Sequence, residues 1–439
     1  MQRRVVITGL GVLACNGIGK EHFWNACIAG QSGIKHITRF DASSLPSQIA
    51  GEIVDFNPYA LGLTEIECQL TDRNTQLALA AANLALQDAG FAQGLSEEER
   101  DMMGVFMGSA MASSEEAEKL WVKLTGRGEH DASNAFQEFI PPTLLMTHAP
   151  AAAIATHHQL HGPCLVISTG CSAGADAIGQ AYWAIQEGRV DRMVTGGADS
   201  AITFAGIDVF CVLGALSTRN DDPERASRPY DLNRDGFVMA EGAGVVVLEE
   251  REMALARNAH IYAELVSFAS NSNAHHMTAL PPDGAPLQQV LRQAMREAGI
   301  TGYQLDYINS HGSSTAYNEA SETVAYKAVF GEQAYSIPIS STKSMIGHAQ
   351  GAASAIETIV TALTLEHQLI PPTINQEVAD PHCDLDYVPN VARPANVRVA
   401  LTHSSGFGGV NTALVLVQPT WLENQQEASA VGRSNDDAI

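Results

Sequence analysis

The 439-residue sequence lacks three features that would place it in other classes of protein. It has no apolar run near the roughly 18 residues that a membrane-spanning helix needs. Its seven cysteines form no Cys-x-x-Cys pair and are an odd number, which fits a reducing cytoplasm and no disulfide framework. Basic residues are scarce: 25 Lys and Arg against 49 Asp and Glu give a formal net charge of −24. Because a phosphate backbone needs a basic surface, we expect no nucleic-acid partner.

Composition and length predict a folded protein of two units. Hydrophobic residues make up 45% of the chain and charged residues 17%, which is typical of a globular protein. The chain is too long for a single core. The apolar stretch VVITGLGV contains glycines and no cleavage site, so it predicts a first strand rather than a signal peptide. The histidine pairs His157-His158 and His275-His276 lack the spacing of metal ligands, and we expect no metal site.

The two halves of the sequence repeat one order of elements. A helix that ends at glycine and a following strand are predicted at 74–91 with MMGVFMGS, and again at 287–300 with LDYINSHG. A strand, a turn and an alanine-rich helix occur in CLVISTGCSAGADAI and again in SIPISSTKSMIGHAQGAASAI. Aligned on the glycine of each turn, Cys171 corresponds to His348. We therefore expect an α/β fold of two similar layered halves, whose corresponding helix starts lie close together.

The boundary between the halves is expected just after the predicted strand 245–248. This gives an N-terminal half of residues 1–255, which carries the cysteine turn, and a C-terminal half of residues 256–422, which carries two candidate histidines. The polar stretch 423–439 is expected to be a disordered tail.

Cys171 lies in STGCSAGADAIGQ, between an apolar strand and a helix of small residues. A buried, inert thiol is the ordinary alternative for a cysteine, and we expect it for the other six, at positions 15, 27, 68, 164, 211 and 383. Cys171 differs because the free N–H groups and the dipole at a helix start favour an anion, which lowers the pKa of a thiol. Cys171 is therefore the candidate nucleophile.

Two histidines stand in turns that follow strands, His311 in INSHGSSTAYNEASE and His348 in SSTKSMIGHAQGAAS. Either alone could be structural, but a thiol with two imidazoles can transfer an acyl group and then stabilise an enolate. Lys343 could supply a fixed positive charge or be an ordinary surface lysine. Glu319 and Glu322 follow His311 on a predicted helix, where a first-turn acid is ordinarily only a partner of the helix dipole.

The glycine-rich stretch SSGFGGVN, residues 404–411, follows the predicted strand VRVALTH. Its backbone N–H groups could form an oxyanion hole together with the N–H of Cys171. A simple tight turn is the alternative, because this motif is weak on its own.

As a set, these motifs resemble the β-ketoacyl-acyl-carrier-protein synthases of the thiolase superfamily over nearly the whole chain, from VVITGLGV to TALVLV. Cys171 in GCSAG matches the family nucleophile. His311 and His348 match its two histidines, Lys343 matches its lysine, and Phe407 matches its gating phenylalanine. The strings RNDDPERASRPYDLNRDGFVMAEGA, NAHHMT and DPHCDLDYVP are most similar to ketosynthase alpha subunits of type II polyketide synthases. The resemblance implies the thiolase-like duplicated fold with α-β-α-β-α layers.

The sequence departs from the family pattern at three places. Ser313 stands where threonine is usual, which keeps a hydroxyl for the pantetheine arm. Residues 403–405, His-Ser-Ser, replace the frequent Asn-Ser-Phe and remove an aromatic ring from the acyl pocket or its gate. Asn318-Glu319 replaces Asn-Asp or Gly-Asp and keeps the acid.

The activity that the resemblance implies is a decarboxylative Claisen condensation. Cys171 would take an acyl chain from a carrier-protein thioester, while the N–H groups of Cys171 and Phe407 hold the oxyanion. His311 and His348 would assist the decarboxylation of malonyl-carrier protein and stabilise the enolate. Attack of this carbanion on the Cys171 thioester would lengthen a polyketide or fatty acyl chain by two carbons.

The resemblance also implies supporting roles for four further residues. Lys343 and Glu319 would hold the histidines and balance charge. Ser313 and Thr315 would hydrogen-bond the phosphopantetheine of the carrier. No metal or organic cofactor would be needed, because decarboxylation drives the condensation.

The resemblance implies an acyl carrier protein and a dimer as partners. The dimer would form with a cysteine-less homologue, the chain-length factor, or with a second copy of this chain. Residues 134–155 match the region that shapes the acyl tunnel across that dimer, or they are an ordinary buried helix and loop. Because the carrier is typically acidic, docking would need a local basic patch or the partner subunit; Arg73 and Arg219 are candidates, or plain solvated arginines.

Four other functions remain as alternatives. A primary fatty-acid ketosynthase would share every motif. A ketosynthase-like acyltransferase that makes esters or amides often loses one histidine. A degradative thiolase needs a second catalytic cysteine in the C-terminal turn, and only Cys383 lies near it in the sequence. A non-catalytic chain-length factor would lack the nucleophile, but Cys171 is present.

Overall fold

The computed structural model describes residues 3–130 and 141–425. Eleven strands of these residues form one sheet in the order β11-β10-β14-β15-β9-β1-β8-β7-β5-β6, with β2 beside β1. The strands of the first half are β1 Val5–Ala14, β2 Gly17–Ile18, β5 Met103–Gly108, β6 Cys164–Ile167, β7 Arg192–Asp199 and β8 Gly242–Glu250. Those of the second half are β9 Ala263–Ser272, β10 Tyr307–Asn309, β11 Ile339–Ser340, β14 Val399–Ser405 and β15 Val410–Val417. Two small ribbons add β3 Lys35–His36 with β4 Ile49–Ala50, and β12 Leu369–Ile370 with β13 Arg393–Pro394.

The strand order confirms the duplication that the sequence predicts. Apart from β2, each half contributes five strands to the sheet. If these five are numbered in chain order, both halves have the spatial order 3-2-4-5-1. The directions repeat as well, because the first two pairings in each half are parallel and the last two antiparallel. The halves are joined edge to edge where β1 pairs with β9, from Val5 opposite Leu265 to Ile7 opposite Ala263.

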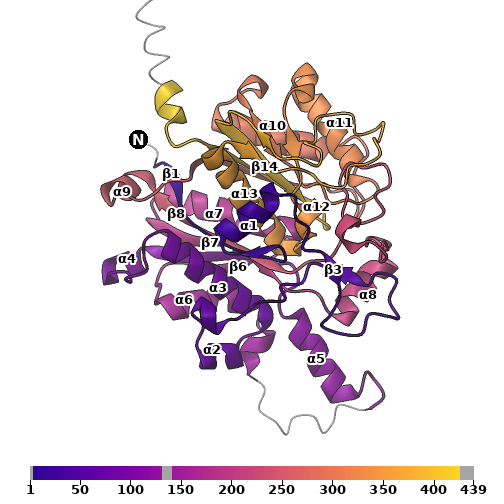
Figure 1. Ribbon diagram of the computed structural model, residues 1–439. Helices are drawn as coiled ribbons and strands as arrows, with labels where there is room; N and C mark the ends of the chain where they lie inside the picture. Colours follow the sequence, from indigo (N-terminus) through magenta and orange to yellow (C-terminus); the bar gives the residue numbers. More distant parts are fainter. Residues whose placement is uncertain (1–2, 131–140, 426–439) are drawn as a thin grey trace, which may run out of the picture.

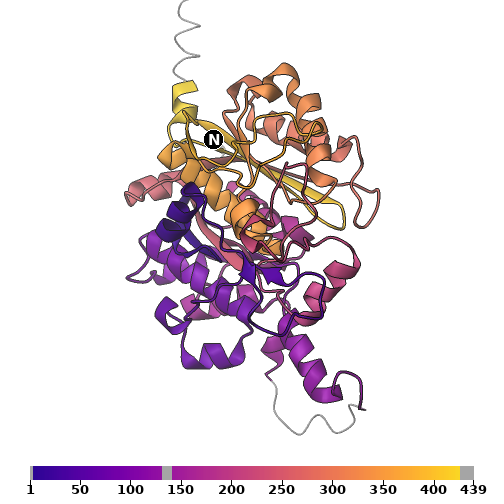
Figure 2. The same cartoon turned by 45° about the vertical axis from the view of Figure 1, so that its right-hand side comes forward.

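Two helices form the central layer between the halves. These are α7 Ala173–Gln186 and α13 Ala353–His367, which contact each other and strands of both halves. On the outer face of the first half lie α3 Arg73–Asp88 and α6 Ala149–His158, and on that of the second α10 Ala285–Ala298 with α11 Asn318–Phe330 beside it. Figures 1 and 2 show the second half, in orange and yellow, stacked on the first, in indigo and magenta. The central helices α7 and α13 thus lie between the strands of the first half and those of the second, which gives the expected α-β-α-β-α arrangement.

Small residues allow the two central helices to begin side by side. A Cβ on Gly174 would lie 2.8 Å from the Cβ of Ala355 and 2.9 Å from the carbonyl oxygen of Gly351. Such a contact leaves no room for a side chain. The glycines that align the two repeats in the sequence are therefore where the repeats meet in space.

The remaining helices lie around the layers. They are α1 Lys20–Ile28, α2 Glu65–Leu70, α4 Glu97–Asp101, α5 Ser114–Thr125, α8 Phe204–Val212, α9 Arg251–Ala256 and α12 Lys343–Ile346. Helix α5 projects from the first half in both views (Figures 1 and 2). Within the described residues, no helix is both long enough and apolar enough to cross a bilayer.

Two predicted segments extend beyond the described residues. Of segment 134–155, residues 134–140 lie outside them, and the rest forms a short 3-10 turn, Pro142–Leu145, and most of α6. Of the predicted tail, residues 426–439 lie outside, whereas Glu423 is described and pairs with Arg251.

The seven cysteines are all free thiols. Cys27 and Cys383 are buried as expected, and Cys15, Cys68 and Cys211 are partly buried. The expectation of a buried thiol is wrong for Cys164, which is exposed because β6 is the edge strand of the sheet.

Candidate active site

A cavity of about 500 Å³ brings the three predicted reactive side chains together. Cys171 comes from the start of α7 in the first half, whereas His311 and His348 come from turns after β10 and β11 in the second. The ring centroids of His311 and His348 are 5.3 Å apart. Residues about 140 to 180 positions apart in the chain thus share one cavity because the duplicated halves place corresponding helix starts against each other.

Cys171 sits in a 3-10 turn, Gly170–Ser172, that leads directly into α7. Its residue is only 8% exposed. The backbone N–H of Phe407 donates a hydrogen bond to the thiol, and the N–H of Cys171 itself also faces it. Gly406 allows this approach, since a Cβ there would lie 3.0 Å from the Cys171 nitrogen. Two N–H groups therefore lie beside the sulfur, where they could also donate to the carbonyl oxygen of a thioester formed on it.

The expected lowering of the thiol pKa is wrong. Burial raises the pKa of Cys171 to about 11, although Lys343 and the N–H of Phe407 both act to lower it. Desolvation of a fully enclosed thiolate outweighs one nearby ammonium and a helix start. The thiol of Cys171 is thus protonated at neutral pH.

His348 is held in one orientation by its own turn. The backbone N–H of Gln350 donates to Nδ1 of His348 at 3.0 Å, so Nδ1 is the acceptor and Nε2 carries the proton. Burial, with a contribution from Lys343, holds the pKa of His348 well below its ordinary value. His348 is therefore a neutral hydrogen-bond donor.

His311 is fixed in the same state by Lys343. The ammonium of Lys343 donates to the carbonyl oxygen of His311 at 2.6 Å, and it lies 3.5 Å from Nδ1 of the ring. The hydroxyl of Ser404 is 3.2 Å from that Nδ1 and 3.2 Å from the carbonyl oxygen of Cys171. Burial, the charge of Lys343 and the neighbouring His348 keep the pKa of His311 well below its ordinary value. With Nδ1 facing a cation, the ring proton is assigned to Nε2.

Lys343 is a buried charge and not a surface lysine. Its side chain is 1% exposed and forms an ion pair with Glu357 of α13. Burial raises the pKa of Glu357 to about 7, and Lys343 opposes that rise. The ammonium of Lys343 lies beside both imidazoles, and it adds to the effect of burial in keeping them neutral.

Glu319 and Glu322 do more than accompany a helix dipole, because both are buried and bind the loop that carries His311. Glu319 accepts the N–H of Ser314, and Glu322 accepts the N–H of Gly312 at 3.0 Å. Burial raises the pKa of Glu319 to about 8, against the effect of Arg234, whose Nε lies 3.4 Å away. Neither glutamate lines the cavity, so both act on the loop.

The remaining predicted residues lie along the wall of the cavity. Ser313 and Thr315 line it with their hydroxyl oxygens 2.9 Å apart. Phe407, which is 37% exposed, stacks on Phe210 with a centroid distance of 6.2 Å. Ser405 and Phe210 of α8 also line the cavity. Ser405 has no aromatic ring, and Phe210 supplies one to this wall.

Three supporting residues were missed by the sequence analysis. Ser404 contacts His311, and Glu357 pairs with Lys343. Asp199 accepts the backbone N–H of Gly351, in the turn after His348. For Glu357 a weak signal existed, because an acid on an otherwise alanine-rich and apolar helix must face a partner. Asp199 has no such signal, since its partners come from two segments far from it in the sequence, residues 109–111 and Gly351.

One docking candidate is not available for a partner. Arg73 forms an ion pair with Glu241 at 2.7 Å and donates to the carbonyl oxygen of Ile53, so its guanidinium is already engaged. Arg219 is partly exposed and makes no ion pair with any described residue. Across residues 3–130 and 141–425, no three His, Cys, Asp or Glu side chains cluster as metal ligands would.

Comparisons with known proteins agree on one family. Residues 2–254 match the model "Beta-ketoacyl synthase, N-terminal domain", and residues 262–377 match "Beta-ketoacyl synthase, C-terminal domain". The tetracenomycin polyketide synthase ketoacyl synthase alpha subunit of Streptomyces glaucescens is 43% identical over 95% of this chain and 98% of its own. The 3-oxoacyl-[acyl-carrier-protein] synthase 2 of Coxiella burnetii is also 43% identical, over 94% of this chain and 98% of its own.

Solved structures show the same similarity. A type II polyketide ketosynthase, solved with its acyl-carrier protein and bound to the hexaketide, has a TM-score of 0.87 and 38% identity. It is matched over 95% of this chain and 100% of that one. The ishigamide ketosynthase/chain length factor has a TM-score of 0.87 and 34% identity over the same shares.

Proposed function

Because the chain belongs to the beta-ketoacyl synthase family, we propose that it elongates a polyketide chain by decarboxylative condensation at Cys171. The observation that carries this proposal is the single cavity lined by Cys171, His311 and His348. A thiol with two neutral imidazole donors suits acyl transfer followed by enolate stabilisation.

Acyl transfer comes first. The sulfur of Cys171 attacks the thioester carbonyl of an acyl-carrier protein, and the proton of the thiol leaves with the pantetheine sulfur. The N–H groups of Cys171 and Phe407 stabilise the tetrahedral oxyanion. The high pKa of the Cys171 thiol favours transfer of the proton during the attack over a preformed thiolate.

Condensation follows on the acylated enzyme. Malonyl-carrier protein loses carbon dioxide, and the electrons of the broken C–C bond form an enolate. The Nε2–H groups of His311 and His348 donate to the enolate oxygen, because both Nδ1 atoms are occupied as acceptors. The enolate carbon attacks the Cys171 thioester, the C–S bond breaks, and the thiolate recovers a proton from solvent.

The other predicted residues support these two steps. Burial and the charge of Lys343 keep both imidazoles neutral, and Glu319 with Glu322 fixes the loop of His311. The hydroxyls of Ser313 and Thr315 bind the phosphopantetheine, and the Phe407–Phe210 stack gates the cavity. No step requires a metal or an organic cofactor, since loss of carbon dioxide supplies the carbanion.

We assign two kinds of partner, an acyl carrier protein and a second ketosynthase-like subunit. The edge strand β6 supports the second, because Cys164 and Leu165 are exposed there and Leu165 is 51% exposed. An open, apolar sheet edge invites pairing with another strand. The opposite edge strand, β11, is buried. The partner is a chain-length-factor homologue or a second copy, and seven free thiols support a cytoplasmic location.

The test is to weigh the carrier-bound product formed from acyl- and malonyl-carrier protein. Condensation predicts release of carbon dioxide and a longer chain. Cys171→Ala is expected to abolish loading and to lower condensation by about 10³-fold or more. Cys171→Gln should also fail to condense, yet it should still decarboxylate malonyl-carrier protein.

Cys68→Ala is the matched control, because it removes a partly buried thiol of α2 that lies outside the cavity. Its activity should equal that of the unchanged protein. Condensation by Cys171→Ala would overturn the proposal, and an ester or amide of unchanged chain length would identify an acyltransferase. Extension that stops after one round, at a single β-ketoacyl-carrier protein, would identify fatty-acid elongation, because that pathway reduces the β-keto group before the next round; repeated rounds identify polyketide elongation. Fatty-acid elongation is the second candidate, which the Coxiella relative favours.

A further inference from the structure

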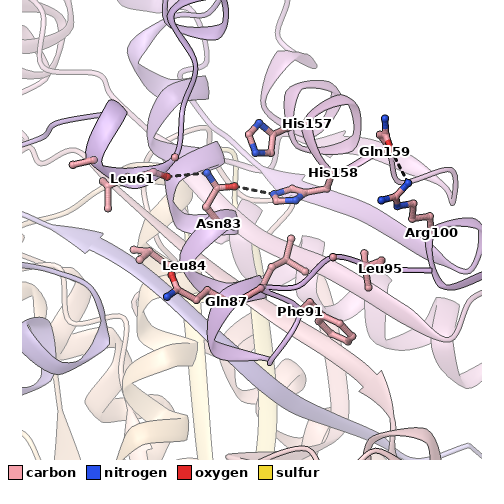
Figure 3. A pocket seen from close by; sticks show the side chains of 15 residues that line it. Leu61, Asn83, Leu84, Gln87, Phe91, Leu95, Arg100, His157, His158 and Gln159 are labelled. Carbon is pink, nitrogen blue, oxygen red and sulfur yellow. Dashed lines mark hydrogen bonds between the residues drawn. The ribbon is translucent and has the colours of Figure 1, made fainter. Parts of the chain in front are cut away.

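A second cavity of about 560 Å³ lies on the outer face of the first half (Figure 3). It is bounded by the 3-10 turn Tyr59–Leu61, by α3, by the loop from α3 to α4, and by the C-terminal end of α6. None of its lining residues lines the cavity of Cys171. Its volume lies within the range of about 300–1,000 Å³ typical of small-molecule sites.

One end of this cavity presents an arginine without a carboxylate partner. Nη1 of Arg100 donates to Oε1 of Gln159 at 2.6 Å (Figure 3). Nε of Arg100 is buried and has no partner, and no carboxylate of the described residues lies within ion-pair distance. An unpaired guanidinium is the group that a planar carboxylate fits best.

The acidic neighbours of Arg100 on α4 do not satisfy it. Glu99 accepts hydrogen bonds from Ser96, and Asp101 lies 2.6 Å from Nδ1 of His161. Glu97 and Glu98 are exposed to solvent. The positive charge of Arg100 therefore remains open to a ligand.

The other end of the cavity is held rigid by a chain of hydrogen bonds. Asn83 donates to the carbonyl oxygen of Leu61 at 2.8 Å, and its Oδ1 lies 2.8 Å from Nε2 of His158 (Figure 3). The carbonyl of Asn83 can only accept, so Nε2 of His158 carries the proton. His157 lies edge-on to His158 with its Nδ1 2.6 Å from Glu67. These groups leave no free charge at this end.

The wall between the two ends is formed mainly by apolar side chains, with the amide of Gln87 among them. The apolar side chains are those of Leu61, Leu84, Leu86, Phe91 and Leu95. Arg192 and Arg257 lie 5.5 Å and 4.4 Å from the centroid of the Phe91 ring, and these cation–π contacts hold it in place. Apolar side chains with a small number of polar groups among them are the usual lining of a small-molecule site.

We propose that this cavity is a second ligand site, which binds a small carboxylic acid with a flat apolar body. The carboxylate pairs with the guanidinium of Arg100. The body lies on the wall formed by the leucines and Phe91. No step of the condensation uses this site, so its occupancy is independent of the catalytic proposal.

The experiment titrates benzoate into the full-length protein, with benzamide as its uncharged isostere, and follows binding by calorimetry and by saturation-transfer NMR. Benzoate should bind with a Kd on the order of 1 mM, as expected for so small a ligand. Arg100→Gln should weaken benzoate about tenfold, to the level of benzamide, because only the charge is lost. Ala92→Trp, at an exposed residue that lines the cavity, should block both ligands.

Arg296→Gln is the control, since Arg296, like Arg100, forms no ion pair with a described residue, but it is exposed and lies at the end of α10. It should bind benzoate as the unchanged protein does. Thermal unfolding of Arg100→Gln should match the unchanged protein, because the Arg100 side chain makes a single hydrogen bond to the described residues, to Gln159. Equal binding of benzoate by Arg100→Gln and the unchanged protein, or no saturable binding at all, would overturn the proposal.

Discussion

At the scale of single residues, the electrostatics of Cys171 are decided by burial. Three nearby features favour the thiolate: Lys343, the N–H of Phe407 and the N–H of Cys171 itself. They do not compensate for the loss of water around the sulfur, and the pKa rises from 9.0 to about 11. We therefore expect the thiol of Cys171 to lose its proton during its attack on a thioester and not before it.

This balance predicts the pH dependence of alkylation. In a Cys164→Ala background, the rate of inactivation by iodoacetamide should rise with pH without a plateau below about pH 10, because only the thiolate reacts. Rates measured between about pH 6 and pH 10.5 test this. A plateau below pH 8 would show a thiolate at rest and contradict the raised pKa.

The same raised pKa has a consequence for stability. The folded thiol keeps its proton while the unfolded thiol ionises above about pH 9, so the folded state binds more protons there. The contribution of Cys171 to the free energy of unfolding therefore falls as pH rises from about 9 to 11.

At the scale of elements, Asp199 connects the two halves beside the active site. It is the last residue of β7, is fully buried, and accepts hydrogen bonds from the Ser109 hydroxyl at 2.8 Å and from Met111 N–H at 2.9 Å. Its other oxygen accepts the N–H of Ala110 at 2.8 Å and of Gly351 at 2.6 Å. The last bond fixes the turn that follows His348. Four donors on one carboxylate thus tie β5 and β7 to the start of α13.

Asp199→Asn should be strongly destabilising. Its amide nitrogen would face the N–H groups of Ala110 and Gly351, so two buried donors would lose their acceptor. We expect a loss of about 2–4 kcal/mol in the free energy of unfolding. Activity should fall through kcat more than KM, because the turn that carries His348 moves.

Chemical denaturation and steady-state kinetics measure both effects, and Asp221→Asn, at an exposed residue, is the control. Burial raises the pKa of Asp199 from 3.8 to about 6, so the folded state holds the extra proton between these values. Its contribution to stability therefore falls as pH rises from about 4 to 6, and this slope should be absent from Asp199→Asn. An unchanged stability of the variant would contradict the role of Asp199.

The elements that could be predicted are those with a local cause. The helix expected at 74–91 is α3, Arg73–Asp88, and the one expected at 287–300 is α10, Ala285–Ala298; both have apolar spacing and a glycine just beyond their ends. The duplication was visible because both halves keep the same glycines. Cys171, His311 and His348, which line one cavity, could likewise be singled out because each stands in a local motif of its own.

What the sequence could not reveal depends on contacts between distant segments. Ser404 binds His311 across 93 positions, and Asp199 binds Gly351 across 152. The raised pKa of Cys171 comes from enclosure by both halves, whereas the turn alone predicts a lowered one. Arg73 looked free in the sequence and is paired with Glu241, 168 positions away. Such effects follow from the packing of the layers, which no local pattern records.

At the scale of the whole molecule, charge and the active site favour an apolar mode of carrier docking. The net charge is −24, and Arg73 is held in an ion pair with Glu241. Few basic side chains are therefore available to form a docking patch. Leu213 and Tyr317 line the cavity of Cys171 and are 49% and 84% exposed, which places them at its mouth. Val212, beside them in sequence at the end of α8, is 82% exposed. Apolar side chains thus surround the opening through which a pantetheine arm must enter.

Salt should therefore improve carrier binding. An acidic carrier and a protein of charge −24 repel each other, and raising the ionic strength from about 0.02 M to about 0.3 M screens that repulsion. We expect the KM for acyl-carrier protein to fall with salt, while the KM for an uncharged acyl-N-acetylcysteamine thioester stays constant. Val212→Ser should raise only the carrier KM, about fivefold, since about 1 kcal/mol of apolar contact is lost. Arg219→Gln should change little. A carrier KM that rises with salt, together with a large effect of Arg219→Gln, would instead place docking on a basic patch that includes Arg219.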